Sequence, residues 1–151
     1  MAESLRLRLE TDLKTAMRAG DITSRDTIRF ILAALKNAEI DKRGALEQKE
    51  EIALLQRQAK RQTESIEQFR AGNRDDLAER EEAQLAILKG YLPAELSDAE
   101  VEALARNVVA EVGASSVKDL GRVMPVLVQR AAGRADGRRL SAAAKTALET
   151  A

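Results

Sequence analysis

The sequence has 151 residues, enough for one medium domain or two small ones with a real hydrophobic core. Hydrophobic residues make up 44% and charged residues 33%, which is typical of a folded helical protein rather than a disordered chain. Lysine plus arginine and aspartate plus glutamate both number 25, so no net charge attracts polyanions. The chain has no cysteine or histidine, which excludes disulfides, the usual zinc sites, and cysteine- or histidine-based catalysis.

The N-terminal half predicts four helices separated by short turns. The first helix carries an apolar stripe with four-residue spacing, made of Leu5, Leu9, Leu13 and Met17. Gly20 is placed to end this helix, and Asp21 to cap a second one. The apolar residues of the second helix share one face, at Ile28, Ile31, Leu32 and Leu35. Its polar face offers Arg25, Arg29 and Lys36.

A longer and more charged helix is predicted over residues 47–72, with a narrow apolar stripe that Gln62 interrupts. Asn73 is placed to cap a fourth helix, and Asp75 and Asp76 follow in its first turn, where the helix dipole favours carboxylates. The residues of the fourth helix that point inward are Leu77, Leu85 and Leu88.

Pro93 marks a boundary in the chain, because a proline disfavours helical geometry at the preceding Leu92. Ser97 and Glu100 then match a capping box, in which the hydroxyl accepts from a backbone amide and the carboxylate reaches back. The sequence therefore predicts two domains, over residues 1–92 and 93–151.

Three short helices are expected in the C-terminal domain. The first has apolar residues at helical spacing throughout and ends at Gly113. Ser116 and Asp119 form a second capping-box pattern at the start of the next helix. Pro125 lies inside that helix and lacks an N–H group, so a kink or break is expected there. The predicted fold class is all-α, with a helical N-terminal domain followed by a small three-helix C-terminal bundle.

Residues 113–140 carry the densest group of basic side chains in the chain. Five arginines fall within 18 residues, at Arg122, Arg130, Arg134, Arg138 and Arg139. Gly133 and Gly137 belong to the turn before the last helix, where they would permit close backbone approach. Forked guanidinium groups beside such a turn suit phosphate oxygens, so these arginines and Lys118 form a candidate RNA-binding site. The alternative is that the arginines pair with nearby carboxylates or cap helix ends.

Aromatic residues make up only 2% of the chain, so base stacking cannot drive binding, and recognition of a folded RNA by its shape and backbone is favoured. The Ser-x-x-Lys pattern at residues 115–118 lacks the other elements of serine-enzyme chemistry, and a helix cap explains it. Acidic clusters along helices are typical of solvated faces rather than metal sites. We therefore expect no catalytic residue, no metal and no cofactor.

The location predicted from the sequence is the cytoplasm. No apolar run approaches the roughly 20 residues that a membrane-spanning helix needs. Residues 1–13 contain acidic side chains and no apolar core of the kind that secretory signals carry. We therefore expect neither a membrane partner nor a secretory or transit peptide.

Several motifs resemble those of the GatB/YqeY family and occur in the same order. They are A-L-K-N-A-E-I-D at 34–41, E-S-I-E-Q-F and A-G-N-R-D-D-L-A-E-R-E within 64–81, Y-L-P at 91–93, and G-R-V-M and G-R-A-D-G within 121–137. The sequence departs from the family at Pro125, where a helix former or glycine is usual, and at Val128-Gln129, close to a common methionine–proline pair.

This resemblance implies a stand-alone relative of the C-terminal tail of the GatB protein of the aspartyl/glutamyl-tRNA amidotransferase, a tail that reaches the outer corner of tRNA. The function implied is a non-catalytic accessory module that binds tRNA. A second interpretation is an adaptor that binds an amidotransferase or an aminoacyl-tRNA synthetase. A third is a component of a carbon–nitrogen ligase that uses glutamine as amido-N donor, although the catalytic domain of that enzyme is absent here.

Overall fold

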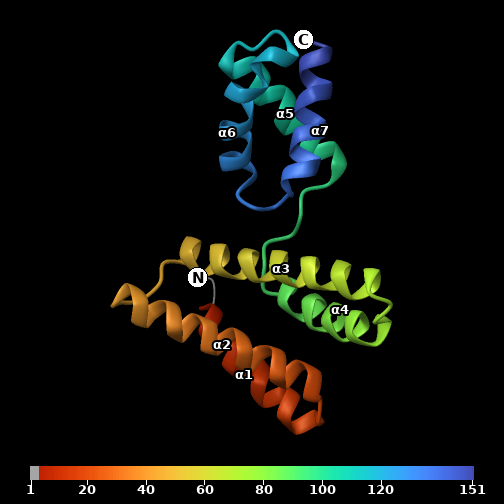
Figure 1. Cartoon of the computed structure of the whole chain (residues 1–151). Coiled ribbons are helices and arrows are strands. Elements are labelled where there is room, and N and C mark those ends of the chain that lie inside the picture. Colours follow the sequence, from red (N-terminus) through yellow and green to blue (C-terminus); the bar gives the residue numbers. More distant parts are fainter. Residues whose placement is uncertain (1–3) are drawn as a thin grey trace. The chain divides into compact units, whose positions relative to one another are not determined.

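The computed structural model describes residues 4–151, and within this range the chain forms seven α-helices, one short 3-10 helix and no strand (Figure 1). The predicted all-α fold class is confirmed. Residues 1–3, the start of the predicted N-terminal domain, lie outside the described range. The chain divides into two compact units, Met1–Leu92 and Pro93–Ala151, and each has its own hydrophobic core.

Four helices build the N-terminal unit: α1 (Leu5–Ala19), α2 (Ile22–Lys42), α3 (Gln48–Ala71) and α4 (Asp75–Lys89). Helix α1 packs along α2, α3 packs along α4, and α2 also packs on α4 (Figure 1). The buried core between them consists of Leu9, Ile28, Ile31, Leu35, Leu55, Ile66, Ala78, Leu85 and Leu88. Aliphatic side chains therefore supply the whole buried part of this core.

The turn between α1 and α2 follows the prediction. Gly20 adopts a left-handed conformation with φ of 69°, which a glycine reaches without strain, and so ends α1. The Asp21 side chain then accepts a hydrogen bond from the Ser24 amide at 3.1 Å and caps α2.

The turn between α3 and α4 differs from the prediction in its cap. Asn73 was expected to cap α4, but it adopts a left-handed conformation with φ of 58° and follows Gly72, the C-cap of α3. Asparagine tolerates this conformation better than most residues, and Arg74 takes the N-cap position of α4 without a capping hydrogen bond from its side chain.

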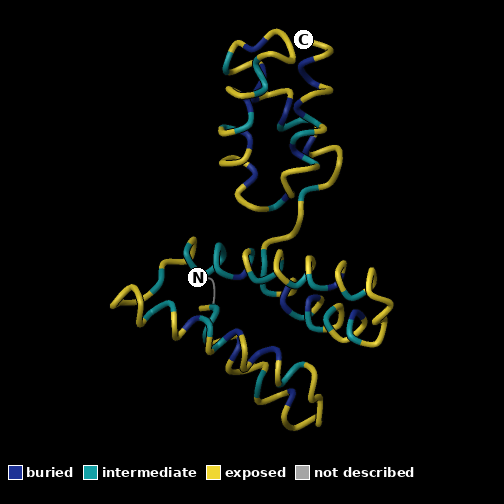
Figure 2. Tube along the Cα trace, in the orientation of Figure 1, coloured by how far each residue is buried: buried dark blue, intermediate teal, exposed yellow. Residues whose placement is uncertain are grey.

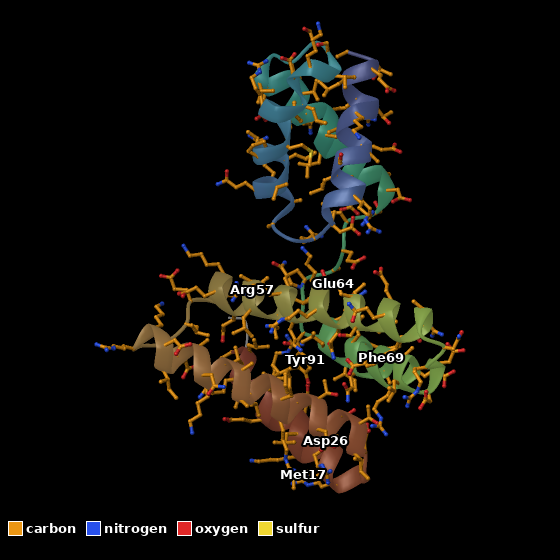
Figure 3. The ribbon with its side chains drawn as sticks, viewed as in Figure 1. Met17, Asp26, Arg57, Glu64, Phe69 and Tyr91 are labelled. Carbon is orange, nitrogen blue, oxygen red and sulfur yellow. The ribbon has the colours of Figure 1, made fainter. Side chains whose placement is uncertain are left out.

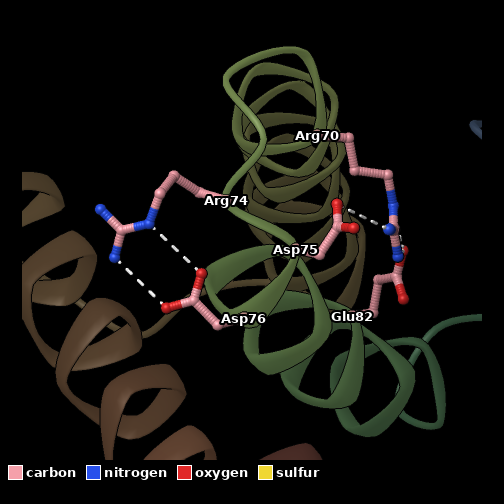
Figure 4. A network of polar contacts seen from close by, with 5 residues as sticks. All are labelled: Arg70, Arg74, Asp75, Asp76 and Glu82. Carbon is pink, nitrogen blue, oxygen red and sulfur yellow. Dashed lines mark hydrogen bonds and ion pairs between the residues drawn. The ribbon is translucent and has the colours of Figure 1, made fainter.

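Ion pairs join the two sides of this turn (Figure 4). Arg70 near the end of α3 contacts Glu82 on α4 at 2.6 Å and Asp75 at 3.5 Å. Arg74 donates to both carboxylate oxygens of Asp76 at 3.2 Å. Hydrogen bonding to Glu82 raises the pKa of Arg70, and hydrogen bonding to Arg74 lowers the pKa of Asp76. The A-G-N-R-D-D-L motif thus has a structural role in this helical hairpin.

The C-terminal unit contains α5 (Asp98–Val112), the 3-10 helix η1 (Val117–Asp119), α6 (Leu120–Ala131) and α7 (Gly137–Glu149). The three α-helices pack on one another around a core that includes Val108, Val123, Leu127, Leu140 and Leu148.

Both predicted capping residues of this unit are in place. The Ser97 hydroxyl accepts a hydrogen bond from the Glu100 amide at 3.1 Å. The same hydroxyl donates to the Glu100 carboxylate at 3.0 Å, so this carboxylate bonds to the side chain of Ser97 and not to its backbone amide. Ser116 and Asp119 form the reciprocal capping box at the start of η1.

Of the kink or break expected at Pro125, the break is wrong, because α6 continues through this residue from Leu120 to Ala131. Proline removes only one helical hydrogen bond, to the carbonyl of Gly121 four residues earlier. Gly121 and Pro125 are both exposed, so water can hydrate that carbonyl.

Candidate functional site

The basic residues predicted to bind RNA lie at both ends of α6 and do not form one corner. Lys118 and Arg122 lie where η1 leads into α6, whereas Arg138 follows α6 at the start of α7. The intervening helix has 12 residues and is therefore about 18 Å long (Figure 1). The structure thus separates side chains that are close in the sequence.

Arg130 forms a two-pronged ion pair with a carboxylate of its own unit. Its two terminal nitrogens contact both oxygens of Glu111 on α5, one of them at 2.7 Å. This hydrogen bonding lowers the pKa of the Glu111 carboxyl and raises that of the Arg130 guanidinium. Arg130 therefore joins the ends of α5 and α6, although both side chains are about half exposed and the pair contributes little to stability.

Arg134 and Arg139 hold the extended segment that precedes α5. Arg134 Nε donates to the Ala94 carbonyl at 2.8 Å, and the Leu96 amide donates to the Arg134 carbonyl at the same distance. Arg139 donates to the Leu96 carbonyl at 2.7 Å and to Asp98 at 2.9 Å. These contacts give both arginines a role in the fold, mainly through backbone carbonyls rather than through the carboxylates or helix ends that the alternative interpretation named.

The remaining basic residues of the predicted site are less constrained. Lys118 and Arg138 are exposed and form no hydrogen bond or ion pair within residues 4–151. Arg122 lies 3.6 Å from Asp119. The pKa of the Asp119 carboxyl is lowered mainly by a hydrogen bond from the Ser115 amide. Within residues 4–151, Lys118, Arg122 and Arg138 are therefore the least engaged of the six predicted basic residues.

The two glycines of the predicted turn have different roles. Gly133 has a φ of 76°, which favours glycine, and it follows Ala132, which is also left-handed. Gly137 instead begins α7, has no positive φ, and faces open space where a Cβ atom would be added. The expectation that Gly137 is a turn glycine is corrected: Asp136 caps the helix by accepting from the Arg139 amide at 2.9 Å.

A second candidate surface, which the sequence pattern did not reveal, lies on α2. Ile22, Phe30 and Ile40 are 60%, 55% and 62% exposed, and the exposed Ala33 lies between them. At 100° per residue these four positions fall within an arc of about 80°, opposite the arc that holds Ile28, Ile31 and Leu35. Helix α2 therefore has two faces that carry apolar residues, one buried in the core and one exposed, and Asp26 and Asn37 interrupt the exposed one. Figure 2 shows buried and exposed residues alternating along this helix. We call Ile22, Phe30, Ala33 and Ile40 the α2 row.

Met17 extends this surface onto α1. Placed in the buried stripe by its spacing, Met17 is in fact 53% exposed and its sulfur lies 4.0 Å from Arg29 of α2. Near the α1–α2 turn, Met17 and Ile22 help to line a hollow of about 110 Å³ together with Ala16, Gly20, Asp21 and Arg25. Met17 and Asp26 are labelled beside this turn in Figure 3. The spacing of 18 residues between Ile22 and Ile40, five helical turns, was the signal that could have revealed the row.

A groove of about 330 Å³ also lies on the C-terminal unit, between α5 and the end of α6. Its lining includes Leu96, Ala103 and Leu104 with the two structural arginines Arg130 and Arg134. Because both guanidinium groups already have partners, this groove offers less to a ligand than the α2 row does.

Residues 4–151 contain no group of three or more acidic side chains placed to hold a metal ion. None of the helices in the described part of the chain combines the length and apolar character needed to cross a membrane.

Comparison with known proteins identifies relatives. The sequence profile described as "Yqey-like protein" matches residues 6–148. The chain is 40% identical to "Altered inheritance of mitochondria protein 41, mitochondrial" of Lachancea thermotolerans over 72% of this chain and 59% of that protein. Its identity to the protein of the same name is 36% in Pyrenophora tritici-repentis, over 82% of this chain and 71% of the relative. For the protein of the same name in Meyerozyma guilliermondii the identity is 38%, over 56% of this chain and 44% of the relative. The matched part of the chain thus spans between 44% and 71% of the length of these relatives.

Proposed function

The chain belongs to the YqeY-like family, and we propose that it is an accessory protein that acts by binding another protein. Neither the family description nor the names of the three relatives states a catalytic activity. A binding role agrees with the side chains that the two units expose.

The α2 row is the observation that carries this proposal. Monomeric proteins expose single apolar side chains commonly, but an aligned series opposite a helix's buried face is typical of an interaction surface. The cost of leaving Ile22, Phe30 and Ile40 in water is recovered when a partner covers them.

The class of partner follows from the motif resemblance. The motifs within residues 121–137 resemble the tail of the GatB protein of the amidotransferase, so an amidotransferase or an aminoacyl-tRNA synthetase is the partner we propose. Any carbon–nitrogen ligation with glutamine as the amide donor would then be performed by the partner.

The proposal is tested by affinity capture of the full chain from nuclease-treated extract. A variant with Phe30→Gln and Ile40→Gln replaces two of the large apolar side chains of the α2 row without adding charge. The matched control carries Val117→Gln and Val128→Gln, which are 45% and 50% exposed on the C-terminal unit. We expect a stoichiometric protein partner with the wild type and the control, and its loss with the α2 variant. Equal capture by all three proteins would contradict the proposal.

tRNA binding is a second candidate, because Lys118 and Arg138 are exposed and have no partners within the described residues. Arg122 is a third candidate although it also lies 3.6 Å from Asp119, whereas Arg130, Arg134 and Arg139 form shorter contacts elsewhere in the fold. Three phosphate contacts predict a slope of about −2 to −3 in a plot of log affinity against log salt. Titration of tRNA against wild type and Lys118→Glu/Arg138→Glu at about 50 mM salt tests this, since unchanged affinity would exclude these residues.

Location enters the proposal through the relatives. Their names assign them to mitochondria, whereas the sequence alone favoured the cytoplasm. We include a mitochondrial location in the proposal, and fractionation of cells that express the full protein tests it.

A further inference from the structure

We propose that the segment docked on the α2 row is an amphipathic helix whose apolar stripe is bordered by acidic residues. This inference rests on the proposed function and specifies the chemistry of the partner. Three features of the N-terminal unit carry it: the straight course of the row, the hollow at one end, and the basic residues beside it.

The straight course of the row fits a helix better than an extended segment. Ile22 and Ile40 lie at the same angle on α2 and are about 27 Å apart along its axis. Ala33 lies between Phe30 and Ile40, and its small side chain lets a facing helix approach the backbone closely. Extended segments often bind by adding a strand to a sheet edge, and residues 4–151 contain no strand that could offer one. A helix in contact over this length would place anchors at three-, four- and seven-residue intervals.

The hollow beside Met17 supplies an anchor point at the beginning of the row. It is lined by Ala16, Met17 and Ile22 on its apolar side and by Arg25 on its polar side. Methionine fits irregular partners because its side chain is unbranched and polarizable. One aliphatic side chain of the docked helix would enter this hollow, while others pack against Phe30 and Ile40.

Basic residues run parallel to the α2 row along one edge. Arg25, Arg29 and Lys36 are spaced by four and seven residues, so they follow the same course along α2. Arg25 forms an ion pair with Asp26 at 2.9 Å. Within residues 4–151 the Arg29 side chain has one polar contact, to the Met17 sulfur, and Lys36 is exposed. A carboxylate on the docked helix would complement Arg29 and Lys36 and would fix its register.

The test uses the full chain with a benzophenone amino acid in place of Asn37, which lies beside the α2 row. The same group in place of Glu102, exposed on α5, is the control position. Cross-linked segments are sequenced after irradiation in cells. We expect the benzophenone group at position 37 to capture a segment with an apolar heptad-like stripe and flanking Asp or Glu residues. The same group at position 102 should not capture this segment.

Charge reversal then tests the basic edge. Arg29→Glu/Lys36→Glu should slow the association of the captured segment, made as a synthetic peptide, about tenfold at low salt. Arg57→Glu/Lys60→Glu, which reverses two exposed charges on α3, should leave it unchanged. Circular dichroism of both variants confirms that the fold is retained.

The outcomes separate the inference from the proposed function. If the group at position 37 captures no protein beyond the control level, both the inference and the proposed function fail. If it captures a protein segment that lacks the acidic amphipathic pattern, only the inference fails. Cross-links to a lipid, to RNA or to a second copy of this chain would also overturn it.

Discussion

Tyr91 connects two parts of the N-terminal unit that lie far apart in the sequence. Its hydroxyl donates to Asp12 on α1 at 2.5 Å, and its ring lies 5.2 Å from the guanidinium carbon of Arg8. Arg8 also approaches the Gly90 carbonyl at 3.4 Å. The Y-L-P motif, whose proline marks the domain boundary, therefore also fastens the end of the unit to its first helix.

Tyr91→Phe tests this contact, because it removes the hydroxyl and keeps the ring. Loss of a hydrogen bond to a charged acceptor should lower the free energy of unfolding of the N-terminal unit by about 1 to 2 kcal/mol. Urea denaturation at neutral pH, followed by a probe in residues 4–92, measures the change. An unaltered midpoint would show that the hydroxyl contributes nothing to stability.

The same residue gives the unit a dependence on alkaline pH. Burial raises the pKa of the Tyr91 hydroxyl well above its ordinary value, and the hydrogen bond to Asp12 adds to the rise. Because the folded state holds this proton more tightly, the stabilisation is complete below about pH 10 and is lost as the pH rises further. Tyr91→Phe should have a flatter stability profile above pH 10 than the wild type.

Residue-level predictions succeeded where the interaction is local. Gly20, Asp21 and Ser97 have the predicted roles because a cap involves residues three or four positions apart. Asn73 was misassigned because asparagine suits both a cap and a left-handed turn, and only the path of the chain decides between them. The contact of Tyr91 with Asp12 spans 79 residues, and nothing near either residue indicates it.

At the level of elements, the segment before α5 depends on α6 and α7 for its position. It has no helical hydrogen bonds of its own, so Arg134 and Arg139 supply partners for the carbonyls of Ala94 and Leu96. The sequence showed a dense basic segment but could not show that the acceptors lie about 40 residues earlier in the chain. The assignment of these arginines to RNA stays a prediction, and their contacts with this segment are what the sequence could not reveal.

Arg139 and its neighbour Arg138 form a matched pair for testing this role. Arg139→Met removes the donors to Leu96 and Asp98, whereas Arg138→Met removes an exposed side chain without a partner in the described range. We expect the Leu96 amide to exchange its hydrogen about tenfold faster in Arg139→Met, for a loss of roughly 1.5 kcal/mol, and at the wild-type rate in Arg138→Met. Equal exchange in both variants would argue against the structural role.

Helix α2 shows a further limit of sequence patterns at this scale. Its buried face was predicted correctly from Ile28, Ile31 and Leu35, because one apolar stripe is what a helix on a core requires. The second face was overlooked since Asp26 and Asn37 interrupt it and its apolar residues are widely spaced. Only the exposure of Phe30 and Ile40 in the folded structure distinguishes the two faces.

For the molecule as a whole, the all-helical class followed from composition and periodicity, since both reflect how each helix meets its core. The two cores have no residue in common, and the C-terminal one draws only on residues from Leu96 onward. A unit of this size has a small core and therefore little stability to lose.

Leu127→Ala should consequently unfold the C-terminal unit and spare the other. Leu127 is fully buried, and truncating such a side chain costs about 2 to 5 kcal/mol, comparable to the stability that a core of this size supplies. Hydrogen exchange followed by mass spectrometry should show lost protection in α5, α6 and α7 and retained protection in α1 to α4. Leu7→Ala, at a half-exposed position on α1, is the control and should change neither pattern. Lost protection in both units would mean that the N-terminal core depends on the C-terminal one, and binding effects of C-terminal variants could then not be assigned to that unit alone.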